Sequence, residues 1–117
     1  MSTQHASLTS ERWGRFPLAQ QLLMIANEMN RASKLLGPGD GDRLRNGYER
    51  VLALVDLTVQ VNPRRSLRRE LLRWRDLIAE LYIAPEADPR AHGAAFRMLL
   101  QLHPETWRQH PYVTGSA

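Results

Sequence analysis

The chain has 117 residues, of which 43% are hydrophobic and 24% are charged, and it contains no cysteine. This length corresponds to one domain that can bury a core without cross-links, and the lack of cysteine excludes disulfides, thiolate metal sites and cysteine nucleophiles. No apolar run approaches the roughly 18 residues that a membrane span needs, and the polar N-terminus lacks the apolar segment of a secretory signal. We therefore expect a single cytoplasmic domain that does not enter a membrane.

The net charge of +4 is concentrated in one short segment. Residues 64–75 hold six arginines and one glutamate, a net charge of +5, so the remaining residues together carry −1. Of the 16 basic residues in the chain, 15 are arginine. Because arginine is preferred over lysine along the whole chain, the arginine content by itself is weak evidence for phosphate binding.

Residues 1–12 are polar and without periodicity, so we expect a flexible tail followed by one domain over 13–117. Apolar residues at steps of three and four predict a first helix over 17–36, opened by Pro17 and closed by the turn Gly37-Pro38-Gly39. A second helix is predicted over 42–61, capped by Asp40 or Asp42. Its apolar stripe is unusually wide, which indicates burial on more than one side or a homodimer.

The third helix is predicted over 65–83, between Asn62-Pro63 and Pro85, with a narrow apolar face that includes Trp74. Asp88-Pro89 is typical of a helix start and predicts a fourth helix over 89–102. Short connections place consecutive helices antiparallel. The predicted fold is therefore all-α, an up-and-down bundle of about four helices.

The basic segment carries the main candidate binding residues, which are Arg64, Arg65, Arg68, Arg69, Arg73 and Arg75. Only Arg73 has carboxylates three residues away on the predicted helix, and four of the arginines crowd a helix N-terminus, where the helix dipole disfavours cations. Three explanations are open. The arginines pair within the bundle, with Asp56 level with Arg69 or Arg73, or they bind nucleic-acid phosphates, or they dock on an acidic protein surface.

Two acidic residues, Glu28 and Asp56, are predicted to be buried or paired. Glu28 lies at the edge of an apolar stripe, where a carboxylate is costly unless it is paired, and Arg31 lies three residues further on. The alternative for Glu28 is a ligand or metal carboxylate.

The sequence does not predict a metal, cofactor or catalytic site. Bundle di-metal sites use Glu-x-x-His pairs, and none of the four histidines falls in the first three helices. We expect His5, His92, His103 and His110 to be solvated or capping residues. The glycine-rich segment 37–41 lacks the Gly-Lys-Ser/Thr ending of a phosphate-binding loop, so it is interpreted as a turn.

Three aromatic residues near the ends of the chain, Trp13, Trp107 and Tyr112, have two interpretations. They fold back over the ends of the bundle, or they are exposed anchors for a partner, because tryptophan and tyrosine are enriched in interface hot spots.

In length and helix layout the chain resembles small helical export chaperones such as the flagellin chaperone, although no motif matches and no residues carry over. The resemblance implies a binding module. The first hypothesis is a non-enzymatic interaction module (an adaptor, chaperone-like protein or complex subunit) that binds a protein partner, with a homodimer as one expected assembly. The alternative is a nucleic-acid-binding subunit that contacts phosphates through the arginines of residues 64–75.

Overall fold

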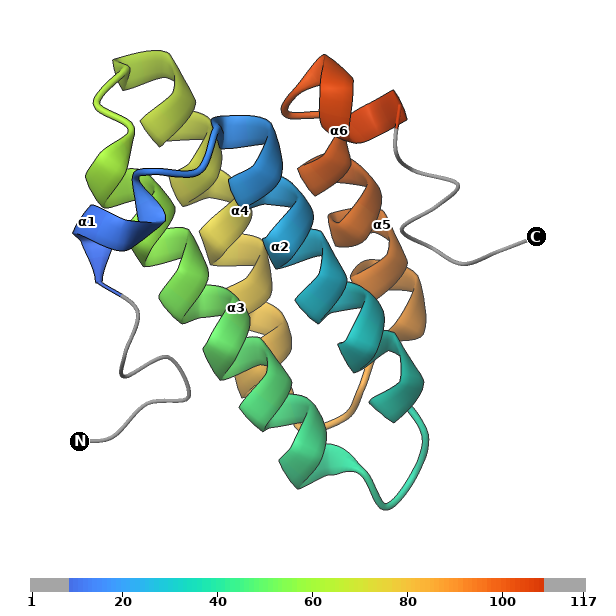
Figure 1. Cartoon of the computed structure of the whole chain (residues 1–117). Coiled ribbons are helices and arrows are strands. Elements are labelled where there is room, and N and C mark those ends of the chain that lie inside the picture. The colour runs from blue at the N-terminus through green and yellow to red at the C-terminus, as the bar shows by residue number, and fades with distance from the viewer. Residues whose placement is uncertain (1–8, 109–117) are drawn as a thin grey trace.

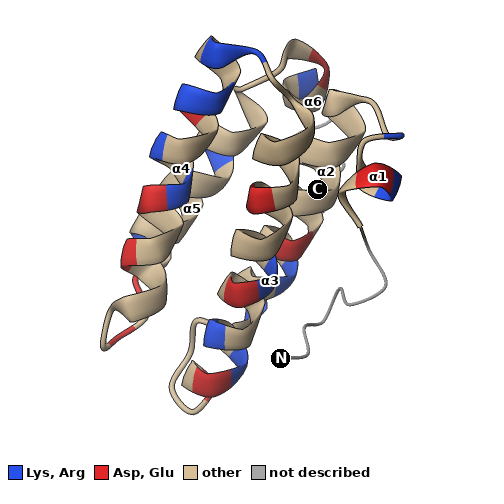
Figure 2. Cartoon of the chain, turned by 90° about the vertical axis from the view of Figure 1, so that its left-hand side faces the viewer, with Lys and Arg blue, Asp and Glu red and all other residues tan. Residues whose placement is uncertain are grey.

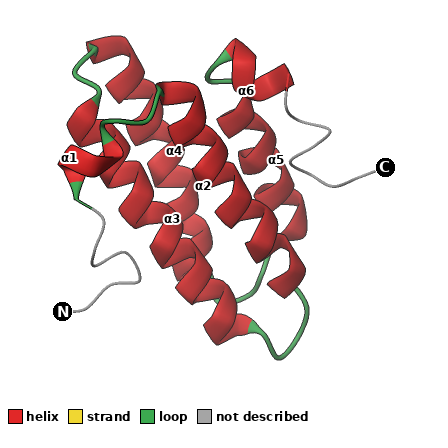
Figure 3. Ribbon diagram, in the orientation of Figure 1, coloured by secondary structure: helices red, strands yellow, loops and turns green. Residues whose placement is uncertain are grey.

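The computed structural model describes residues 9–108, and every regular element in this range is helical. Figure 1 labels the α-helices, and Figure 3 shows that the segments between the helices are loops. The elements, in chain order, are α1 (Ser10–Trp13), α2 (Leu18–Ala32), the 3-10 turn η1 (Ser33–Leu35), α3 (Gly41–Val61), α4 (Arg65–Ile83), α5 (Pro89–Leu100) and α6 (Pro104–Arg108).

The four long helices, α2 to α5, run alternately down and up (Figure 1). Each helix packs on its chain neighbour, and α5 also packs on α2, so the four helices form a closed ring. The short helix α1 packs on α3, and α6 covers the end of α2 and α5. The predicted all-α, up-and-down bundle is therefore confirmed.

The ends of the helices follow from local sequence. Pro17 occupies the N-cap of α2, and the Asp88 carboxylate caps α5 by accepting a bond from the amide of Ala91 at 3.0 Å. Asp40 lies at the N-cap of α3 without a capping side-chain bond, because its carboxylate pairs with Arg43 instead. The turn before α3 uses Gly39 at φ +92°, in the left-handed region that glycine tolerates.

The core lies inside the ring and is built from the apolar stripes of all four long helices. Its fully buried members include Leu22, Ile25, Val51, Leu71 and Leu99. Trp74 is also buried, as expected, and its indole N–H donates to the carbonyl of Ala95 at 2.7 Å. This bond ties α4 to α5. No helix within residues 9–108 is long and apolar enough to cross a membrane.

Part of the segment expected to be a tail is ordered as α1, and Trp13 at its end is completely buried. The Trp13 indole donates to the hydroxyl of Thr58 on α3 at 3.0 Å. Gln21 on α2 donates to the carbonyls of Trp13 and Phe16, at 3.2 and 2.8 Å. Trp13 therefore folds back into the core, which corrects its assignment as an interface aromatic.

The helices α3 and α4 pair in a different register from the predicted one. Asp56 lies opposite Arg75, and it does not lie level with Arg69 or Arg73. The contact between Glu49 and Tyr82 has the same register. Both contacts are symmetric about residues 65–66, three residues later than the Asn62-Pro63 break, because the first turn of α4 projects beyond the end of α3.

Candidate interaction surface

Arg68 turns inward and caps the end of α3. Its Nε donates to the carbonyl oxygens of Val59 and Asn62, at 3.0 and 2.9 Å. These carbonyls belong to the last turn of α3, where helical partners are missing and the helix dipole is negative. Arg68 is therefore occupied in holding the α3–α4 connection together.

Two further arginines of the segment are paired with carboxylates. Arg75 binds Asp56 on α3, with 2.7 Å between Nε and Oδ1, and this hydrogen bond raises the pKa of Arg75. Arg73 lies 3.8 Å from Glu70 within α4. Intrabundle pairing, the first of the three explanations, thus applies to part of the segment, and Asp56 is paired as predicted.

The remaining three arginines of the segment are exposed to solvent. The side chains of Arg64, Arg65 and Arg69 are exposed and form no ion pair or hydrogen bond with the described part of the chain. Arg64 is the N-cap residue of α4, and Arg65 and Arg69 lie in its first turns, the blue end of that helix in Figure 2. Fewer arginines of the basic segment are therefore available to a partner than the sequence indicates.

The second half of α4 and the loop after it have the opposite charge. Residues 76–88 contain four acidic residues, Asp76 and Glu80 on α4 and Glu86 and Asp88 after it, and no basic residue, which gives a net charge of −4. All four are exposed, and Figure 2 shows the change from blue to red along α4. Because a helix dipole favours anions at the N-terminus and cations at the C-terminus, the charge on α4 opposes its dipole at both ends.

An apolar groove runs between α4 and α5 on the same side of the bundle. It consists of two adjoining hollows of about 410 and 360 Å³ that share Leu77 and Met98. Trp74 and Leu102 line one hollow, and Leu81 is among the residues that line the other. Charged residues flank the groove at both ends: Glu70 and Arg73 at one, Glu80 and Asp88 at the other.

Large apolar side chains are also exposed on α4 and α5. Leu72 and Met98 are each 48% exposed, and Ile83 is 76% exposed. We call the outer face of α4 together with the groove the α4–α5 surface. It includes Arg65, Arg69, Leu72, Arg73, Asp76, Leu77, Glu80, Ile83 and Met98.

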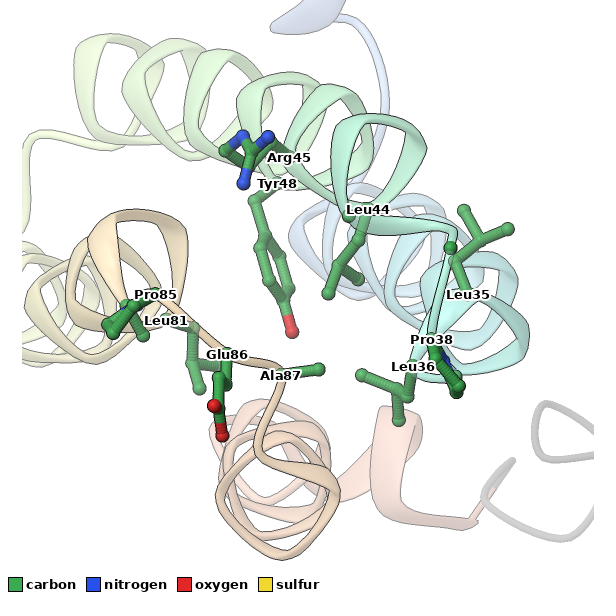
Figure 4. A pocket seen from close by; sticks show the side chains of 14 residues that line it. Leu35, Leu36, Pro38, Leu44, Arg45, Tyr48, Leu81, Pro85, Glu86 and Ala87 are labelled. Carbon is green, nitrogen blue, oxygen red and sulfur yellow. The ribbon is translucent and has the colours of Figure 1, made fainter.

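A second cavity, of about 410 Å³, lies at the opposite end of the bundle from α6, between the loop after η1 and the α4–α5 loop (Figure 4). Leu36 and Ala87 line it, the Tyr48 hydroxyl points toward its interior, and Arg45 and Glu86 also contribute side chains. Arg45 is already paired with Asp42 on its own helix. The charge of Arg45 in this cavity is thus already paired within the protein.

The Tyr48 hydroxyl is part of a buried hydrogen-bond chain. It lies 2.7 Å from Nδ1 of His92, and Nε2 of His92 lies 3.0 Å from the carbonyl oxygen of Met29. Since a carbonyl only accepts, Nε2 carries the proton and Nδ1 accepts from the hydroxyl. Burial lowers the pKa of His92, and burial together with the charge of Asp88 raises the pKa of Tyr48 to about 12. Both groups are neutral and bonded, so His92 is a core residue, contrary to the prediction of a solvated or capping histidine.

Glu28 forms a structural ion-pair cluster. Its carboxylate lies 3.0 Å from Nε of Arg50 on α3 and 3.3 Å from a guanidinium nitrogen of Arg31 on α2. The pairing with Arg31 was expected from the sequence, whereas Arg50 was not. Two cations hold this carboxylate at the α2–α3 interface.

The other predicted site residues lie near the chain end. Trp107 on α6 is 41% exposed, and Tyr112 lies outside the described residues, as do His5 and His110. The His103 ring accepts a bond from the amide of Glu105 at 3.1 Å at the start of α6, so it is a capping histidine. Within residues 9–108, no three histidine, aspartate or glutamate side chains are grouped as metal ligands.

Comparisons with known proteins add no family to this description. No protein-family model matches the chain, and neither curated proteins nor solved structures give a match. The class of the protein is thus defined by its fold, an all-α helical bundle, and its function is inferred from the surface described above.

Proposed function

We propose that this protein is a non-enzymatic helical-bundle interaction module that binds a protein partner through the α4–α5 surface. It would act as an adaptor, a chaperone-like protein or a subunit of a complex. The observation that carries the proposal is the apolar groove at Leu77 and Met98, together with the exposed Leu72 and Ile83 elsewhere on the outer face of α4. Exposed apolar surface among charged side chains is typical of protein interfaces.

The partner chemistry that fits this surface is an amphipathic helix. A groove between two antiparallel helices accepts the apolar stripe of a third helix, as in other helix-in-groove complexes. The flanking residues set the polarity of such a helix, because Arg65 and Arg69 favour acidic side chains at one end and Glu80 favours basic ones at the other.

The buried polar groups also favour binding over catalysis. A general base needs a free lone pair within reach of a substrate, and both ring nitrogens of His92 are occupied by Tyr48 and Met29. Glu28 is held by two arginines. The cytoplasmic location expected from the sequence stays part of this proposal.

Nucleic-acid binding is the alternative, and the structure favours it less. Of the six clustered arginines, only Arg64, Arg65 and Arg69 have no side-chain partner among residues 9–108, and acidic residues follow in the second half of α4 and the loop after it. An acidic stretch beside a phosphate-binding site repels the backbone that the arginines attract. The same juxtaposition suits a protein partner that carries both charges.

Site-specific photo-crosslinking in cells that naturally produce the protein tests the proposal. A photoreactive residue in place of Met98 is expected to form a protein adduct, because the groove is covered in the complex. The matched control is the same residue in place of Asn27, which is exposed on α2. Equal adduct yields at the two positions would contradict the proposal.

A further inference from the structure

The charged residues of α4 are unfavourably placed with respect to its helix dipole, and a partner with opposite charges would compensate them. The first turns of α4 carry Arg65, Arg68 and Arg69, and its second half carries Asp76 and Glu80 without a basic residue after Arg75. Both ends are unfavourable in the field of the helix dipole. Arg65 and Arg69 in the first part form no ion pair with the described residues, and neither does Glu80 in the second.

A helix with this pattern is complementary to itself when two copies run antiparallel. Arg69 lies five residues before Trp74, the midpoint of α4, and Glu80 lies six residues after it. In an antiparallel pair with its two-fold axis near this midpoint, Arg69 of each copy lies level with Glu80 of the other. Such a two-fold interface repeats every favourable contact twice.

The middle of the same surface combines apolar and charged side chains. Leu72 and Leu77 flank the midpoint of α4, the exposed Arg73 and Asp76 lie between them, and Met98 lies beside Leu77 across the groove. An interface centred there brings Arg73 of each copy level with Asp76 of the other, so it combines apolar contacts with opposite charges. It also covers the side chains whose exposure is otherwise unfavourable.

From these observations we infer that the protein forms a symmetric homodimer in which the α4–α5 surfaces of two copies pack antiparallel, with Arg69 of one copy paired with Glu80 of the other. The inference rests on the proposed function, since it identifies a second copy of the chain as the protein that covers the surface. In the dimer each end of α4 also lies beside the opposite end of the partner helix. The negative C-terminal end of that helix favours the arginines, and its positive N-terminal end favours Glu80.

Charge reversal tests the antiparallel pairing. Sedimentation velocity across a concentration series is expected to show a monomer–dimer equilibrium that weakens with added salt. R69E and E80R each place like charges opposite each other, and each is expected to weaken self-association by about tenfold or more. The double variant R69E/E80R restores opposite charges in every pair and is expected to recover the dimer.

Mixing the two single variants gives a second prediction. R69E and E80R are expected to form a heterodimer with each other more strongly than either associates with itself, because both of their cross-pairs are attractive. The control R15E reverses an exposed arginine that follows α1, on the opposite side of the bundle from α4 in Figure 2, and it should leave the dimer intact. All substituted residues are exposed, so unchanged thermal unfolding of dilute samples verifies that each variant folds.

Three results would overturn the inference: a monomer at every concentration, a dimer indifferent to the single reversals, or a double variant that does not recover. The proposed function fails separately. A monomeric protein that still crosslinks through position 98 to a different protein loses the homodimer but keeps the interaction module, whereas absence of any adduct there removes both.

Discussion

Arg68 and Asn62 are joined by a 2.9 Å hydrogen bond from the guanidinium Nε to the backbone carbonyl at the end of α3. The same nitrogen also contacts the carbonyl of Val59. One of the six clustered arginines thus stabilises the bundle, although its sequence neighbours Arg65 and Arg69 face solvent. The cluster is divided by helix geometry into a structural side and an exposed side.

Loss of the Arg68 cap should destabilise the fold. We expect Arg68→Gln to lower the free energy of unfolding by about 1–2 kcal/mol, because carbonyls at the end of α3 lose a charged donor. Urea denaturation followed by circular dichroism measures this change. The neighbouring control Arg69→Gln should stay within about 0.5 kcal/mol of the wild type, since it removes a solvent-exposed cation from a helix N-terminus. Equal losses in the two variants would refute the division of the cluster.

Trp13 is expected to behave as a core residue. Trp13→Phe leaves a cavity and removes the donor to Thr58, so it should cost about 1–3 kcal/mol of unfolding free energy. The matched substitution Trp107→Phe affects a side chain that is 41% exposed and should cost less than about 1 kcal/mol. If Trp13→Phe were the milder of the two in thermal denaturation, α1 would not be part of the folded domain.

Stability should fall in mild acid because of His92. Burial holds the pKa of His92 below that of the unfolded chain, about 6.5, so below this pH the unfolded state binds a proton that the folded state does not. The free energy of unfolding is therefore expected to decrease between about pH 7 and pH 5, by up to about 1.4 kcal/mol per pH unit from this group.

Denaturation curves of two histidine variants identify the source of this slope. His92→Gln should lose the contribution, whereas His103→Gln, a change at a capping histidine, should retain it. A wild-type profile that matches that of His92→Gln throughout this range would show that His92 does not couple folding to protons.

Nucleic-acid binding provides a direct comparison with the alternative function. We expect no measurable binding of duplex DNA or single-stranded RNA at about 50 mM salt, where phosphate contacts are strong. Fluorescence anisotropy with labelled oligonucleotides measures it. Salt-sensitive binding that disappears in the triple variant R64Q/R65Q/R69Q would instead favour the phosphate-binding function.

The sequence predicted the fold well because each long helix has a clear apolar period and a recognisable start or stop. The predicted bounds 65–83 coincide with α4, and Pro17 and Asp88 mark the starts of α2 and α5. The segment before Pro17 was harder to predict, because the four residues of α1 are too few to show a hydrophobic period. The contact that holds α1 on the bundle is the burial of Trp13, which the sequence alone does not show.

The candidate site was less accessible to sequence analysis. The partner of Arg75 depends on how far α4 projects beyond α3. The spacing of hydrophobic residues in the sequence does not predict this distance. A signal for His92 was present, since His92, Phe96 and Leu99 follow one another at steps of four and three on the buried face of α5. Its partner Tyr48 is 44 residues away in the chain, and that contact is a product of tertiary packing.

The central claim, that a protein covers the α4–α5 surface, is tested most directly by thiol protection in cells. Because the chain has no cysteine, Leu72→Cys and Asn27→Cys each carry a single thiol on an exposed position. Leu72→Cys should be alkylated several-fold more slowly in cells than as a dilute purified protein, whereas the rate for Asn27→Cys should change little. Equal ratios of the two rates for both variants would contradict the account.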